Sequence, residues 1–144
     1  RLIMINLVGK WHIVQVLQFN DNSNQMEWTK SEDILSGEDV DRDTITLLNS
    51  IVEFEEDGRM LMLAPIPEGV SQDEIDEAVK AGQIHLKDGR MYFEEQHWKV
   101  EGGVNYTDTM PEGEVLGEKV GPWEKVTEFE DGTVTFLTYR LARI

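Results

Sequence analysis

The chain has no cysteine among its 144 residues. Disulfide bridges and thiolate ligands are therefore excluded, which fits the cytoplasm and does not exclude an exported protein. No apolar run reaches the length of about eighteen residues that a membrane-spanning helix needs. Basic residues are also scarce, since 13 stand against 29 acidic ones and the formal net charge is −16. Such a surface repels nucleic-acid phosphates and anionic membranes, so neither is expected as a partner.

Motifs that perform catalysis or hold a cofactor are absent from the sequence as well. The histidines His12, His85 and His97 have no metal-ligand spacing, so the sequence predicts no metal and no cofactor. The chain contains neither a Gly-X-Ser-X-Gly nucleophile motif nor a glycine-rich phosphate loop. Acidic residues are so numerous that a pair such as Glu94 and Glu95 does not define an acid–base site. No catalytic residue is predicted, and an enzyme is the least supported alternative.

Turn signals divide the chain into short apolar segments. Asp57-Gly58, Asp88-Gly89 and Asp131-Gly132 each separate two such segments, and Gly102-Gly103 has the same character. Asp-Gly suits a tight hairpin because both central residues of that turn need positive φ. The signals predict a meander of antiparallel strands. The length and the apolar share of 40% favour one domain over residues 1–144.

The segments between these turns predict eight strands. They cover residues 10–19, 51–56, 59–64, 83–87, 90–100, 104–107, 123–129 and 133–141. An antiparallel sheet of this size either closes into a barrel or splits into a sandwich. Short hairpin connections favour closure, because a sandwich needs longer crossing connections and only residues 108–122 are free to form one. The predicted fold class is all-β, an eight-stranded antiparallel up-and-down barrel.

Two insertions, after the first and third strands, have helix signals. Thr29-Lys30-Ser31-Glu32 and Ser71-Gln72-Asp73-Glu74 both have the spacing of a capping box. A further short helix is expected near residues 39–48, and Gly82 is suited to end the helix that follows Ser71. Because neighbouring strands alternate in direction, both insertions are expected at the same rim of the barrel, where they would cover its mouth.

Gly9-Lys10-Trp11 opens the first strand, and Arg140 lies near the end of the last. This pattern resembles that of the lipocalins and wider calycins, in the loosely defined lipocalin-like form found in bacteria. The resemblance implies that Arg140 packs over Trp11 and that Gly9, Trp11 and Arg140 form a structural signature at the closed end. The chain departs from the family in having Tyr106-Thr107-Asp108 where lipocalins have Thr-Asp-Tyr, and in lacking a disulfide.

Four residues are predicted to contact a ligand, namely Trp11, Gln15, Trp98 and Tyr139. Trp11 and Gln15 share one face of the first strand because alternate residues of a strand point the same way. The predicted function is the binding or carriage of a small hydrophobic or amphipathic molecule inside a lidded barrel. The alternative is a non-catalytic interaction or structural module with a filled core. An exposed apolar patch on the helix at residues 71–81 would favour that alternative.

Overall fold

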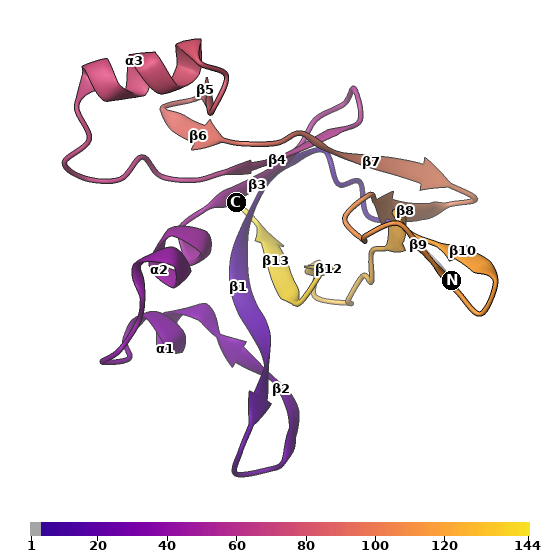
Figure 1. The fold of residues 1–144 in the computed structure, drawn as a ribbon. Coiled ribbons are helices and arrows are strands. Elements are labelled where there is room, and N and C mark those ends of the chain that lie inside the picture. The colour runs from indigo at the N-terminus through magenta and orange to yellow at the C-terminus, as the bar shows by residue number, and fades with distance from the viewer. Residues whose placement is uncertain (1–3) are drawn as a thin grey trace.

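The computed structural model describes residues 4–144, in which antiparallel strands form one curled sheet of nine strands (Figure 1). Eight strands follow one another across the sheet. Their order is β11 (Glu124–Lys125), β8 (Val104–Thr107), β7 (Gln96–Glu101), β4 (Arg59–Leu63), β3 (Ile51–Phe54), β1 (Gly9–Asn20), β13 (Tyr139–Arg143) and β12 (Val134–Phe136). The ninth strand, β2 (Gln25–Lys30), pairs with the far end of β1. The sheet forms an antiparallel half-barrel.

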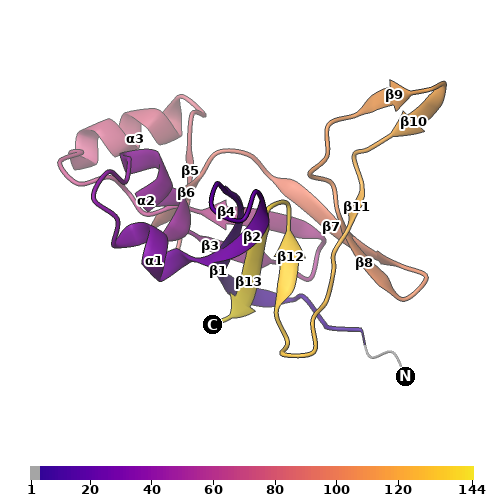
Figure 2. The same cartoon turned by 90° about the horizontal axis from the view of Figure 1, so that it is seen from below.

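Three helices and two small hairpins lie outside this sheet. They are α1 (Ser31–Leu35), α2 (Arg42–Leu48) and α3 (Gln72–Lys80), with the hairpins β5 (His85–Lys87) and β6 (Arg90–Tyr92), and β9 (Gly113–Val115) and β10 (Glu118–Val120). The helices gather on one side of the molecule, and the β9–β10 hairpin projects from the other (Figure 2). The helical insertions therefore share one side, although the first of them follows β2 and not the first strand.

The local signals read from the sequence are largely confirmed. Asp88 and Gly89 both have positive φ, at 52° and 74°, as a tight hairpin turn requires, whereas in Asp57-Gly58 and Asp131-Gly132 only the glycine does. The Ser71 hydroxyl accepts a hydrogen bond from the Glu74 amide at 3.2 Å, which caps α3 as predicted. Gly82 follows α3 with φ of 74°. The expectation of an antiparallel β fold with short helical insertions is confirmed at this level.

The strands themselves are shorter and more numerous than predicted. Residues 90–100 form two strands, β6 and β7, and residues 133–141 turn back on themselves between β12 and β13. Leu137 makes the turn with a φ of 53°. Leucine rarely adopts this conformation, so the sequence does not predict the turn. Neither β2 nor the β9–β10 hairpin is predicted from the sequence. The capping box at Thr29 is also wrong, because Thr29 lies in β2 and α1 begins at Ser31 without a side-chain cap.

Hydrogen bonds extend from the chain between β11 and β12 to both ends of the strand order. The Val126 amide donates to the Asn105 carbonyl of β8 at 2.9 Å. The Thr135 amide of β12 donates to the Thr127 carbonyl, also at 2.9 Å. These bonds draw the two ends of the half-barrel together, although the paired strands do not form the closed eight-stranded barrel that the turns predict.

Most of the buried apolar side chains form one cluster, and Leu61, Leu63 and Ala64 are buried outside it. The members of the cluster are Leu7, Trp11, Ile13, Leu48, Val52, Phe54, Met60, Val126, Val134, Phe136 and Leu141. Trp11 meets Phe54 edge to face with ring centres 6.5 Å apart, and Phe54 meets Trp98 in the same way at 6.0 Å. These three rings therefore pack against one another in a continuous row within the core.

The arginine that covers Trp11 is Arg143, which corrects the prediction that Arg140 does so. The Arg143 guanidinium lies 4.3 Å from the centre of the Trp11 ring, and register pairs Trp11 with Arg143. Arg140 pairs instead with Gln15 and stacks on Phe129 at 3.8 Å. The physical reason is that the last strand continues to Arg143, two residues beyond its predicted end, so the residue opposite Trp11 comes later in the chain.

Gly9 is required by this stack. Its φ is 128°, and a β-carbon at this position would lie 3.0 Å from Nη1 of Arg143. We expect Gly9→Ala to lower the free energy of unfolding by about 1–3 kcal/mol, because alanine is strained at this φ and displaces the guanidinium. Urea denaturation measures the change. Gly113→Ala is the matched control, since Gly113 has no positive φ and a nearest contact at 3.9 Å; equal losses in the two variants would contradict the account.

Leu116 at the tip of the β9–β10 hairpin combines full exposure with a φ of 52°. Asparagine adopts this left-handed conformation more readily than leucine. We therefore expect Leu116→Asn to raise the free energy of unfolding by about 0.5–1 kcal/mol, measured by urea denaturation. Val115→Asn makes the same chemical change at ordinary φ and should give no gain. A loss of stability in Leu116→Asn would show that the side chain packs in solution.

Candidate functional site

A bulge in β1 creates the candidate site. The pairing of β1 with β13 shifts register between Ile13 and Gln15. On the other edge of β1, pairing with β3 ends at His12 and pairing with β2 begins at Gln15, so Ile13 lies between the two partner strands. Ser31, the first residue of α1, is 7% exposed, and its hydroxyl donates to that carbonyl at 2.9 Å. This bond satisfies a buried acceptor and fixes α1 beside the bulge.

An open pocket of about 550 Å³ lies between the bulge and α1. Its apolar part is formed by Ile13, Leu35 and Leu48, of which Ile13 and Leu48 also belong to the core. The polar side chains around it include Gln15, Lys30, Glu32, Asp131 and Arg140. The pocket therefore combines an apolar floor, continuous with the core, with charged groups of both signs.

Arg140 is held rigidly at the rim of this pocket. Its Nε donates to the Thr133 hydroxyl at 2.8 Å, and its Nη2 donates to a carboxylate oxygen of Asp131 at 3.2 Å. The guanidinium also stacks on Phe129. These contacts occupy Nε and one N–H of Nη2, so the N–H groups of Nη1 are available to a ligand.

Asp131 is ionised at neutral pH for a clear physical reason. The Thr133 hydroxyl and amide donate to it at 2.6 and 3.0 Å, and with the charge of Arg140 they lower the pKa of Asp131 below its ordinary value. The charged lining thus contains the cations Lys30 and Arg140 and the anions Glu32 and Asp131, of which Arg140 and Asp131 form an ion pair. In a chain of net charge −16 this is a locally balanced surface.

The predicted ligand contacts are not brought together at one site. Gln15 lines the pocket, whereas Trp11 is wholly buried with its indole N–H bonded to the Leu7 carbonyl at 2.8 Å. Trp98 donates to the Glu55 carbonyl at 2.8 Å and packs on the core. Tyr139 lies against Phe136, with ring centres 6.2 Å apart.

Several residues of the pocket are missed by reasoning from sequence. Ser31 lies within the stretch interpreted as a capping box, and Asp131 and Thr133 lie around a turn. A helix cap and a turn each explain these residues locally, so neither pattern indicates a binding site. The one available signal is the scarcity of cations, since Lys30 and Arg140 are two of only 13 in the chain.

Two further structural observations concern metals and membranes. Within residues 4–144, no three histidine or acidic side chains are grouped so as to hold a metal ion. No helix in the same part of the chain has the length and apolar character needed to cross a membrane.

No family model, curated protein or solved structure matches this chain. The lipocalin-like resemblance of Gly9, Trp11 and an arginine of the last strand therefore stays a prediction. Evidence for a function comes from the geometry of the pocket and from the surface chemistry of the described residues.

The hydrogen bond between the Ser31 hydroxyl and the Ile13 carbonyl is expected to contribute to the stability of the protein. Ser31→Ala leaves the buried Ile13 carbonyl without its partner and should lower the free energy of unfolding by about 1–3 kcal/mol. The control is Ser36→Ala, since the Ser36 hydroxyl makes an exposed bond to the Asp33 carbonyl at 3.0 Å. Urea denaturation compares the two. A loss in Ser31→Ala no larger than in Ser36→Ala would show that the bulge does not depend on this bond.

Proposed function

We propose that the protein binds a small amphipathic molecule, with an apolar chain and one anionic headgroup, in the pocket beside α1. The observation that supports this most directly is the apolar floor that meets a rigid arginine at the rim. The pocket volume of about 550 Å³ is within the ordinary range for small-molecule sites. The proposal places the ligand at the edge of the core and not within the packed interior.

The floor favours an apolar chain. Ile13 and Leu48 are buried members of the core, and Leu35 packs partly against it. Covering apolar surface of this kind contributes about 25 cal/mol for each Å² removed from water. Because the floor is built on α1, α2 and β1, its shape is set by the same contacts that hold the fold.

The rim favours a singly charged anion. Arg140 is fixed by Asp131 and Thr133, so little freedom is lost when Nη1 binds an oxygen. Lys30 supplies a second cation at the rim. Glu32 and Asp131 lie on the same rim and would repel a multiply charged group, so a carboxylate fits better than a phosphate monoester.

We also propose that the curled sheet is a variant of the lipocalin-like barrel. Three features support this. Gly9 and Trp11 have the predicted spacing at the start of β1, and an arginine of the last strand, Arg143, covers Trp11. Hydrogen bonds from residues 126–129 reach both β8 and β12. Short helices lie beside the sheet on one side.

A second candidate function is that of a non-catalytic interaction module. The observation that favours it is the packed core, in which Trp11, Phe54 and Trp98 occupy the space a carried ligand would need. The two candidates differ in whether a small molecule saturates the pocket at all.

Titration with dodecanoate, followed by amide NMR spectra, tests the proposed site. We expect saturable shifts at Gln15, Ser31 and Leu35, and none at the indole N–H of Trp11. Arg140→Met should weaken binding about tenfold, because a charge-assisted hydrogen bond is worth about 1.5 kcal/mol. Dodecanol should bind more weakly than dodecanoate to the unmodified protein and about equally to the variant.

Lys30→Met tests the second cation, and Lys119→Met is its control. Lys119 lies exposed in β10, on the hairpin that projects away from the helices. We expect Lys30→Met to weaken dodecanoate binding several-fold and Lys119→Met to leave it unchanged. Amide shifts that do not saturate with dodecanoate, or equal losses of dodecanoate affinity in the two variants, would refute the anion site. The interaction module would then be the better explanation.

A further inference from the structure

Residues 65–95 form a lobe that has no buried side chain of its own. It contains α3 and the β5–β6 hairpin, of which the hairpin lies against the end of β4 (Figures 1 and 2). Every residue from Pro65 to Glu95 is exposed or half-buried. A segment of this size without a hydrophobic core of its own is held in place by contacts with the rest of the protein.

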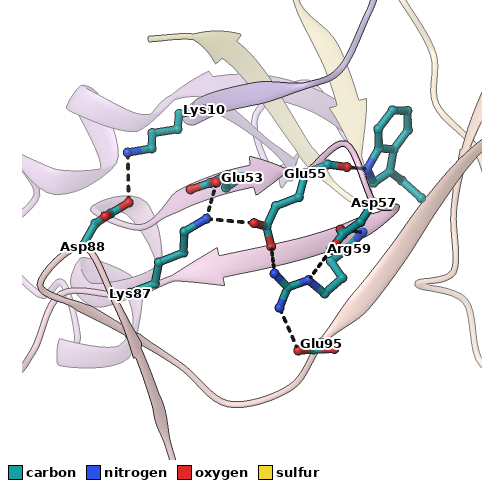
Figure 3. A network of polar contacts seen from close by, with 9 residues as sticks. Lys10, Glu53, Glu55, Asp57, Arg59, Lys87, Asp88 and Glu95 are labelled. Atoms are coloured by element: carbon teal, nitrogen blue, oxygen red, sulfur yellow. Dashed lines mark hydrogen bonds and ion pairs between the residues drawn. The ribbon is translucent and has the colours of Figure 1, made fainter.

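Polar contacts attach this lobe to the sheet. Met91 exchanges two backbone hydrogen bonds with Ala64, at 2.8 and 2.9 Å. Lys87 bridges Glu53 and Glu55 of the β3 segment at 2.5 and 2.9 Å (Figure 3). The hydrogen bond that Lys87 donates to Glu53, supported by the one it donates to Glu55, raises the pKa of Lys87 above its ordinary value, so this lysine is charged at neutral pH.

Further polar contacts strengthen the attachment. Lys10 of β1 pairs with Asp88 at 3.2 Å (Figure 3). Arg90 donates to the Asn49 and Leu63 carbonyls at 2.8 and 3.2 Å. The basic residues Lys87 and Arg90 are therefore directed toward the body of the protein. They are two of the three basic residues in the lobe, which also holds eight acidic ones.

The helix of this lobe is nevertheless well built. The Ser71 hydroxyl caps its first turn, and Gln72 donates to Asp76 along its surface at 2.9 Å. No residue of α3 is buried. Its apolar face is only partly covered, since Ile75 and Ala78 are half-buried and Val79 is exposed.

An apolar stripe on α3 has acidic margins. Ile75, Ala78 and Val79 share one face by helical spacing, and Val79 is 38% exposed. By the same spacing Glu74 and Asp76 lie on either side of this stripe. Elsewhere on the lobe Leu86 and Phe93 are 44% and 58% exposed, so apolar side chains are exposed beyond the helix as well.

We propose that this lobe docks a basic amphipathic helix of a partner protein. Such a helix would cover the stripe of α3 with its apolar face and meet Glu74 and Asp76 with its lysines or arginines. A second copy of this chain presents the same acidic lobe, and an anionic membrane has the same sign of charge, so both are repelled. Charge complementarity therefore selects a basic protein segment.

An eighteen-residue peptide of leucine and lysine at helical spacing is the probe, labelled with a dye and titrated at 150 mM salt with anisotropy as the readout. We expect saturable binding that weakens at least fivefold in Val79→Asn, which leaves the charge unchanged. Val115→Asn makes the same change on the β9–β10 hairpin and should have no effect. Glu74→Gln combined with Asp76→Asn should weaken binding and reduce its dependence on salt.

Equal affinity in the unmodified protein, Val79→Asn and Val115→Asn would mean that the peptide follows net charge alone, and would overturn the proposal, as would the absence of saturable binding. Concentration-dependent dimerisation that Val79→Asn abolishes, seen by sedimentation, would assign the surface to a second copy instead. The dodecanoate titration of Val79→Asn should be unaltered, which separates a failure here from a failure of the pocket.

Discussion

The guanidinium of Arg143 covers the ring of Trp11, and this contact joins the two ends of the chain. Both side chains donate hydrogen bonds to the segment that precedes β1, where three successive carbonyls, at residues 6–8, accept them. The segment is thereby fixed without pairing as a strand. Gly9 follows at a φ of 128°, which brings the backbone under the guanidinium. The wholly buried Trp11 then sets the packing of Phe54 and, through it, of Trp98.

The position of this stack decides where a ligand site can form. Because Trp11 fills the core near the start of β1, the open space lies farther along the strand, where the bulge after Ile13 meets α1. Arg140 pairs with Gln15 at that level and is fixed by Asp131 and Thr133 at the rim of the pocket. Two arginines of β13 thus have different surroundings. Arg143 packs on the core, and Arg140 faces the site proposed to hold an anionic headgroup.

Features set by local chemistry could be predicted from the sequence, and features set by register could not. The Asp-Gly turns, the capped α3 and the first strand depend on neighbouring residues, so their patterns are sufficient. Which arginine covers Trp11 depends on where the last strand ends, and Leu137 makes a turn that leucine does not signal. The pocket could not be predicted from the sequence for a related reason. Ser31 matters because it reaches the Ile13 carbonyl across eighteen positions of the chain, and only the fold brings them together.

The most direct test of this account is a double-mutant cycle between Trp11→Leu and Arg143→Met, measured by urea denaturation. The stack predicts a coupling free energy of about 1 kcal/mol between the two positions. The same cycle between Trp11→Leu and Arg140→Met should give no coupling, because Arg140 stacks on Phe129. Coupling to Arg140 in place of Arg143 would contradict the register between β1 and β13, and with it the location of the pocket.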